Sequence, residues 1–291
     1  MRLSRFYNLA VKFGADRDPR KNRSAITFPD TAILFGRPDT EVRKILVGID
    51  VEAPELLLGD RIRAAQGLDL VVAHHPEGSA YANLYKVMQL QVDMLVKLGI
   101  PAKIAQELLD ERKREVERRV LPQNHMRAPD AARLLGLPFM CVHTPADNHV
   151  YSFIQNLLDK AKPKKVKDIV DILMEIPEYK DAAKYFAGPK IILGSPGRQV
   201  GKCLVEMTGG TEGSKDAFDK IYKAGVRTLI SMHLSEEHLK KVKDANLNVV
   251  IAGHVSSDTL GLNLLLDRIE KEAQEDFEVI ECSGFRRVKR N

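Results

Sequence analysis

The sequence predicts an α/β protein built from two α/β halves. Short apolar runs alternate with stretches of helical period along most of the chain. KILVGID, PELLLGDRIRAAQ and LDLVVA follow one another as strand, helix and strand, which predicts a βαβ unit with two parallel strands. A second series of strands and helices begins at Pro189 and ends with FEVIEC. A chain of 291 residues with 44% hydrophobic content can bury the core that such a fold needs.

The first half is expected to form one α/β lobe over residues 1–150. Apolar residues at helical spacing predict a helix that stops near Gly14, and strands are expected at 32–35 and up to Asp50. A helix that opens with acidic residues then runs to Gly67. From Tyr81, after LDLVVAHHP, the chain has helical period to about residue 135, so we expect a helical insertion at about 90–135.

A helical linker at 151–187 and a second lobe at 188–291 are expected to follow. Pro163 and Pro177 mark the ends of the linker's central helix. In the second lobe, PKIILG, KCLVEM, RTLISMH, NLNVVIAGH and FEVIEC are predicted strands. Most of them are separated by helical stretches, such as SEEHLKKVKDAN and TLGLNLLLDRIEKEAQ.

Composition limits the compartment and the partners. The net charge of +5 is mild, because 40 acidic side chains offset 45 basic ones, and it favours an anionic partner only weakly. Three cysteines without a CxxC pair are typical of reduced thiols, so we expect a cytoplasmic protein. The amino terminus lacks the apolar core of a signal peptide, and no run approaches the ~18 apolar residues of a membrane span. Nucleic-acid-binding signatures are missing, which argues against such a partner.

Five apolar runs end on side chains that can bind a metal. LDLVVAHHP ends on His74 and His75, and the other runs end on His143, His233, His254 and Asp50. The carboxyl ends of strands are where open α/β sheets bind ligands. One such histidine by itself is more often a hydrogen-bonded structural residue. Together, these side chains predict a metal site at strand ends.

The spacing of the candidate ligands points to catalysis with two metal ions. HTPAD and HVSSD repeat a His-x-x-x-Asp pattern, which brings in Asp147 and Asp258. Imidazole and carboxylate without cysteine suit catalytic Zn, Fe, Mn or Co. Neighbours on a strand point to opposite faces, so His74 and His75 can share a site only if Pro76 ends the strand. Two diverging ligands suit two ions, and a bridging acid such as Asp147 would complete a hydrolytic two-metal site.

Other residues are candidates for supporting roles. His233 is a candidate proton carrier, and Asp50 is a candidate for orienting a ligand histidine. The turn TGGTEGS lies between a strand and a helix, so its backbone N–H groups could bind an anion, although an ordinary βα turn is the better explanation of this pattern. The anion-binding candidates in this turn are Thr208, Gly209, Gly210, Thr211, Gly213 and Ser214.

These motifs, in this order, resemble the NIF-three-like (NIF3-like) family, also described as the GTP-cyclohydrolase-one type-two-like family. The resemblance runs through KILVGIDVEAPELL, LDLVVAHHP, CVHTPAD, CLVEMTGGTEGSKDA and NVVIAGHVSSD. It implies two α/β lobes that face each other across a dinuclear metal site, and a homo-oligomer, in the form of a toroidal hexamer. Carried onto this chain, it implies the metal ligands His74, His75, Asp147, His254 and Asp258. Asp50 and His143 remain candidates for residues that surround these ligands and orient them.

The chain departs from the family pattern in places. Asp258 stands where the family usually has glutamate, and Ser231-Met232-His233 replaces a Thr-Gly-Glu signature. We expect the metal site to be retained. The leading hypothesis is a metal-dependent hydrolase, acting as a cyclohydrolase or on a phosphoester or nucleotide, with an anionic small molecule as substrate. The alternatives are a metal-handling protein that stores or inserts the ion, and, with less support, an interaction scaffold.

Overall fold

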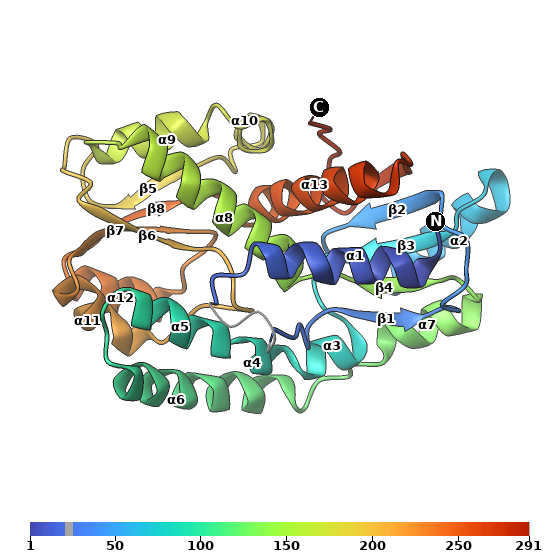
Figure 1. Cartoon of the computed structure of the whole chain (residues 1–291), viewed down its shortest axis with the longest axis horizontal. Coiled ribbons are helices and arrows are strands. Elements are labelled where there is room, and N and C mark those ends of the chain that lie inside the picture. Colours follow the sequence, from blue (N-terminus) through green and yellow to red (C-terminus); the bar gives the residue numbers. More distant parts are fainter. Residues whose placement is uncertain (21–25, 291) are drawn as a thin grey trace.

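The computed structural model describes residues 1–20 and 26–290 and contains two β-sheets, each packed against α-helices (Figure 1). This confirms the predicted α/β fold. Within the described residues no helix combines the length and the hydrophobicity needed to span a bilayer.

The first sheet has the strand order β1-β4-β3-β2-β9. Strands β2, β3, β4 and β9 are parallel, and β1 runs antiparallel to β4 at the edge. Strands β3 and β4 are continuous apolar runs and β2 is nearly so, as expected for strands with both faces covered, whereas β9 at the other edge carries Glu278 and Glu281. The strands are β1 (Ala32–Phe35), β2 (Lys44–Gly48), β3 (Leu70–Ala73), β4 (Phe139–Cys141) and β9 (Glu278–Cys282).

The second sheet has the order β5-β8-β7-β6, with β5 antiparallel to β8 at one edge and the other pairs parallel. Its strands are β5 (Lys190–Leu193), β6 (Lys202–Glu206), β7 (Val226–Ser231) and β8 (Asn248–Ile251). The helices of the chain are α1 (Leu3–Asp16), α2 (Ala53–Gln66), α3 (Gly78–Ala82), α4 (Leu84–Val87), α5 (Gln89–Lys97), α6 (Ala102–Val120), α7 (Arg127–Leu135), α8 (Thr144–Ala161), α9 (Val166–Leu173), α10 (Pro177–Lys184), α11 (Phe218–Lys223), α12 (Glu236–Asp244) and α13 (His254–Ala273).

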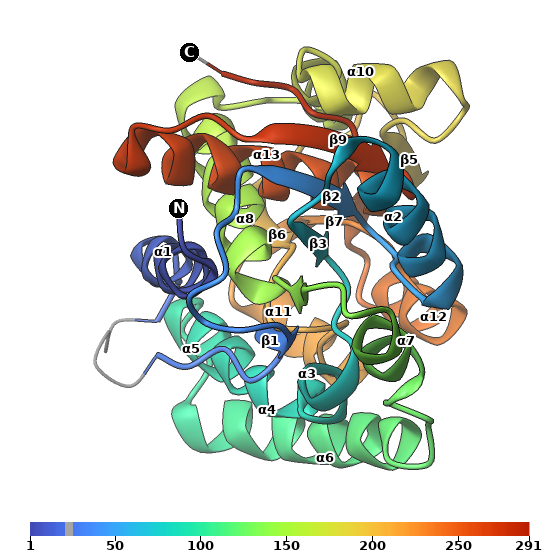
Figure 2. The ribbon, with the colours of Figure 1, turned by 90° about the vertical axis from the view of Figure 1, so that its right-hand side faces the viewer.

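Helices cover both faces of each sheet. Figure 2 shows α1 and α13 on one side of the first sheet and α2 and α7 on the other. On the second sheet, α8 and α9 cover one face, and α5, α6, α11 and α12 cover the other. Of the helices in the 90–135 insertion, α5 and α6 therefore pack on the second sheet, whereas α7 packs on the first.

The last strand, β9, joins the first sheet and not the second, where it had been expected. Residues 188–291 were expected to form the second lobe, but β9 pairs in parallel with β2 and extends the first sheet. Val279 and Ile280 contribute to the packing on either face of that sheet. A strand pattern fixes which side chains are buried, but it does not specify which edge the strand joins.

Two helices, α8 and α13, each follow a strand of one sheet but pack on the other sheet, so the two sheets exchange helices. Helix α8 leaves β4 of the first sheet, yet its Val150, Ile154 and Leu158 pack on the second. Helix α13 leaves β8 of the second sheet, and residues such as Leu262 and Leu266 pack on the first. Figure 1 shows the two helices running in opposite directions from the centre of the molecule. Both therefore begin at the point where the two sheets meet.

Candidate metal centre

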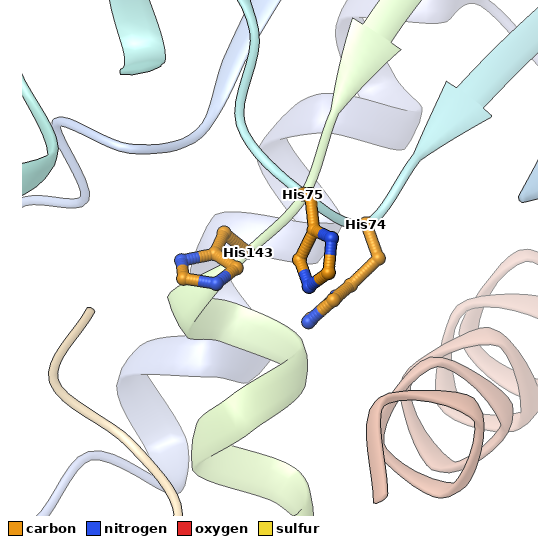
Figure 3. A group of neighbouring side chains, drawn as sticks. All are labelled: His74, His75 and His143. Carbon is orange, nitrogen blue, oxygen red and sulfur yellow. The ribbon is translucent and has the colours of Figure 1, made fainter. Parts of the chain in front are cut away.

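Three histidines come together where β3 and β4 end. His74 and His75 directly follow β3, and their backbone N–H groups continue the hydrogen bonding to Gly48 and Ile49. His143 directly precedes α8. Figure 3 shows the three rings side by side, and the ring centres of His74 lie 5.2 Å from His75 and 5.0 Å from His143. The predicted convergence of these strand ends is present in the structure.

Each of these histidines is fixed through its Nδ1 atom. Nδ1 of His74 lies 3.1 Å from the carbonyl oxygen of Val142 and donates to it. Nδ1 of His75 lies 2.6 Å from Asp50, and Nδ1 of His143 lies 2.8 Å from Asp30. Metal-binding histidines in proteins are commonly held in this way by a carbonyl or carboxylate oxygen. The arrangement leaves the three Nε2 atoms for the interior of the cluster.

The Nε2 atom of His74 faces two carboxylates. It lies 3.3 Å from Asp147 and 3.4 Å from Asp258, and the second oxygen of Asp147 lies 3.8 Å from Nε2 of His143. Two ligands that each lie about 2.0–2.1 Å from one ion at a tetrahedral angle are roughly 3.3–3.4 Å apart. The separations around His74 therefore match atoms that share a metal ion.

Asp258 also joins a second group of ligands. Its Oδ1 faces His74, whereas its Oδ2 lies 3.5 Å from both His75 and His254. His254 opens α13 and is 42% exposed, so this group is nearer to the solvent. The carboxylate of Asp258 is thus shared between two sets of nitrogen atoms. Asp147, the acid that the sequence suggests as a bridge, also directs its two oxygens toward two different histidines, His74 and His143, and its bridging role stays a prediction.

The buried atoms of the cluster lack hydrogen-bond partners. Nε2 of His74, one oxygen of Asp147 and both oxygens of Asp258 are buried and unpaired within residues 1–20 and 26–290. Leaving such polar atoms buried without a partner is costly. A cation at their common centre would satisfy all of them, so the residues present fit a divalent metal ion.

The electrostatics of the cluster point the same way. Burial alone would lower the pKa of His74, but Asp258 and Asp147 outweigh it and raise that pKa to about 10. Burial is likewise outweighed for His75, whose pKa is raised to about 9 by Asp258 and Asp50. Although burial opposes it, the pKa of Asp258 lies well below its usual range because of His74 and His75. The carboxylates thus attract positive charge, which protons or divalent cations can supply.

The second sheet contributes further groups beside this cluster. The ring of His233, just after β7, lies 4.7 Å from the ring of His254. Nδ1 of His233 is 3.5 Å from Glu212, and this contact raises the pKa of His233. Burial opposes ionisation of Glu212, but His233 and His238 outweigh it and lower that pKa to about 2. His233 therefore lies beside the candidate ligands and is paired with a carboxylate.

The turn at 208–214 reaches the same place. Thr208, Gly210 and Thr211 line a cavity of about 40 Å³ together with Asp147 and Asp258. The hydroxyl of Thr208 donates to Asn148.

Several polar groups of this turn already have partners within the protein. The N–H of Gly213 donates to Glu206, and Gly209 packs on Gln91. Because Glu212 lies within the turn and Glu206 lies beside it, an anion there would meet two carboxyl groups. Anion binding by this turn stays a prediction.

Two groups of the site had not been predicted. Asp30 is fully buried, accepts a hydrogen bond from the hydroxyl of Thr144 and holds His143. It precedes β1, and only the antiparallel pairing of β1 with β4 brings it to the end of β4. Glu206 ends β6 and lines the cavity, so the strand-end rule that found the histidines would have found it too.

No family model matches the sequence, and no curated protein does. The structure is similar to a NIF3 superfamily protein from Sphaerobacter thermophilus, with a TM-score of 0.78, 27% identity, and 94% of this chain and 97% of that chain covered.

Two more distant similarities show the fold alone. Reduced HcgD from Methanocaldococcus jannaschii has a TM-score of 0.56 at 14% identity, with 97% of each chain covered. The protein ybgI, described as of unknown function, has a TM-score of 0.58 at 14% identity, with 97% of this chain and 98% of that chain covered.

Proposed function

Because this chain is a NIF3-like protein, we propose that it binds two divalent metal ions and acts as a metal-dependent hydrolase. One observation carries the proposal. The unpaired nitrogen and oxygen atoms of His74, Asp147 and Asp258 converge inside the protein at separations that suit a shared ion.

The division of the ligands favours two ions. His74, Asp147 and Asp258 form one group of mutually close ligand atoms, and His75, His254 and Asp258 form another. Asp258 belongs to both, with a different oxygen in each. Imidazole and carboxylate ligands without cysteine suit Zn, Fe, Mn or Co. A third group of mutually close ligand atoms joins His143 to His74 and His75, so we include His143 as a candidate further ligand.

Hydrolysis needs an activated water and a route for its proton. A bound pair of divalent ions lowers the pKa of a water and polarises the substrate. His233 borders the same cavity, and Glu212 holds its Nδ1 side, so we assign to His233 the transfer of a proton at Nε2. Asp50, Asp30 and the carbonyl of Val142 keep the ligand rings in place.

Metal content tests the binding part of the proposal. Protein purified without added metal and then reconstituted should hold close to two equivalents of a transition metal per chain by elemental analysis. A content below about 0.5 equivalents after reconstitution would contradict the site. The variant His125→Gln is a matched control, because His125 lies outside the cluster and its Nε2 donates to the carbonyl oxygen of Val120.

Turnover tests the hydrolase part separately. The metal-loaded protein should hydrolyse at least one member of a panel of nucleotides, phosphoesters and cyclic amidines, and His233→Gln should remove that activity while the metal content stays unchanged. If nothing is turned over and the bound metal passes rapidly to an apo-protein acceptor, the metal-handling function is the correct one.

The family resemblance further leads us to propose a homo-oligomer, expected to be a hexamer. Light scattering on the eluting protein measures this directly.

A further inference from the structure

A large groove opens beside the metal centre. It has a volume of about 1160 Å³ and lies between α10, the first turns of α13 and the carboxyl-terminal stretch that includes Val288. Met232, His233 and His254 line both this groove and the small polar cavity at the candidate ligands. A molecule in the groove would therefore contact the exposed edge of the metal centre.

The walls of the groove are largely apolar and suit a flat ring. Met232, Ile251 and Val255 line it from the second sheet and α13, and Tyr185 lines it from the end of α10. Val255 and Tyr185 are exposed large hydrophobic side chains. Thioether, imidazole and phenol groups are all good contact surfaces for an aromatic face.

Two buried hydroxyl groups add polarity to one wall. Ser256 and Thr259, in the first turns of α13, line the groove and are 8% and 4% exposed. In the part of the chain that the structure describes, neither hydroxyl oxygen has a hydrogen-bond partner. Rotation about one side-chain bond can turn such a hydroxyl toward the groove. A purely aliphatic ligand would leave these groups unpaired, whereas a ring with heteroatoms would satisfy them.

The rim of the groove carries an excess of positive charge. The two carboxylates on this side are already neutralised, since Glu178 binds Arg290 and Asp181 lies 2.9 Å from Lys184. Lys180 and Arg286 also line the groove. In the described residues Lys180 has no ion-pair partner, and the carboxylate nearest to Arg286 is 3.8 Å away. An acidic group at the rim would therefore be favoured.

From these features we infer that the groove binds the body of the substrate, and that the substrate is an aromatic or heteroaromatic small molecule with an acidic group. The ring lies against Met232 and Val255, the acidic group lies near Lys180 and Arg286, and the opposite end reaches the metal centre. This inference rests on the proposed function, because it takes the centre as the place of reaction. Concave, mostly apolar sites with a few polar groups are typical of small-molecule binding.

Fluorescence titration of the whole protein with 7-hydroxycoumarin-3-carboxylate tests the inference. The ring alone, 7-hydroxycoumarin, titrated at a pH below the pKa of its phenol so that it is uncharged, and inorganic phosphate separate the contributions of the ring and of the acidic group. Ala182→Trp places a bulky side chain on the α10 wall and should weaken binding of the carboxylate probe at least about tenfold. Ala161→Trp, at an exposed alanine outside the groove, should leave binding unchanged.

Charge reversal at the rim gives a second readout. Lys180→Glu should weaken binding of the carboxylate probe but not of the uncharged ring, whereas Lys167→Glu, on the exposed side of α9, should affect neither. Ser256→Ala should weaken binding of both coumarins. Equal binding by the native protein and Ala182→Trp would overturn the inference. So would dissociation of an oligomer by Ala182→Trp, because a second copy would then cover the groove.

The design separates this inference from the proposed function. Binding of the uncharged ring depends on the walls, so it should persist after the metal is removed. A protein that holds no metal but binds the ring in the groove would contradict the hydrolase and keep the groove as a ligand site. A protein with its full metal content and no binding of either coumarin would contradict the groove alone.

Discussion

If the chain binds two metal ions as proposed, Asp258→Asn should weaken the binding of both while leaving the fold intact. Asp258 is buried, and its two oxygens face His74 on one side and His75 and His254 on the other. Asparagine has nearly the same shape but no charge, and its nitrogen cannot bind a cation. Because one carboxylate serves both groups of ligands, a single substitution should affect both ions.

The size of the effect follows from the position of Asp258. Substituting a residue that only orients a metal ligand typically costs 10–100-fold in metal affinity. A shared ligand should exceed that range, so we expect a loss of more than about 100-fold, or about 2.8 kcal/mol, at each ion. Competition with a chromophoric chelator measures the affinity, and elemental analysis measures the number of ions bound.

Two further variants complete this experiment. Asp258→Glu keeps the carboxylate and should retain measurable metal, which guards against a simple folding defect in Asp258→Asn. Asp267→Asn lies on the same helix, where its carboxylate binds Arg287 instead, and should bind metal like the native protein. Two tightly bound ions in Asp258→Asn would refute the shared-ligand geometry.

Three other predictions address the surroundings of the site. Asp30→Asn should lower metal affinity 10–100-fold because His143 loses its Nδ1 partner, and an unchanged chelator competition curve would exclude this role. Removal of the metal with a chelator should lower the melting temperature by roughly 5 °C or more, since an ion at 100 times its Kd stabilises the native state by about 2.7 kcal/mol. Identical calorimetric scans with and without the chelator would argue against metal binding to the native state. Gly261→Val should destabilise the protein by about 1–3 kcal/mol, measured by urea unfolding. A Cβ at Gly261 would lie 2.5 Å from the carbonyl oxygen of Ala146, so α8 and α13 would have to move apart. A variant as stable as the native protein would show that the two helices can separate without cost.

The sequence was most informative about the end of each strand. His74, His75, His143, His254 and Asp50 directly follow apolar runs, and parallel strands bring such positions to one edge. The structure brings all five together, because local pattern and sheet direction together determine where a strand end lies. Their service as metal ligands stays a prediction.

Long-range pairing was beyond the reach of the same reasoning. Asp30 reaches His143 only because β1 runs antiparallel to β4, and β9 joins the first sheet beside β2. Neither pairing leaves a trace in the period of the sequence, since the same alternation fits either sheet. The sequence could not predict which sheet α8 and α13 pack on, because an apolar stripe on a helix indicates that the face is buried but not which element covers it.

The exchange of α8 and α13 means that neither sheet is complete with its own continuous part of the chain. A fragment ending before β5 would keep α8 but lose the strands on which Val150, Ile154 and Leu158 pack, and it would also lose His254 and Asp258. Such a fragment would expose this face of α8 unless a second molecule covered it, as happens in domain-swapped dimers. We therefore expect the whole chain to melt in one cooperative transition, with metal release and loss of both sheets at the same temperature.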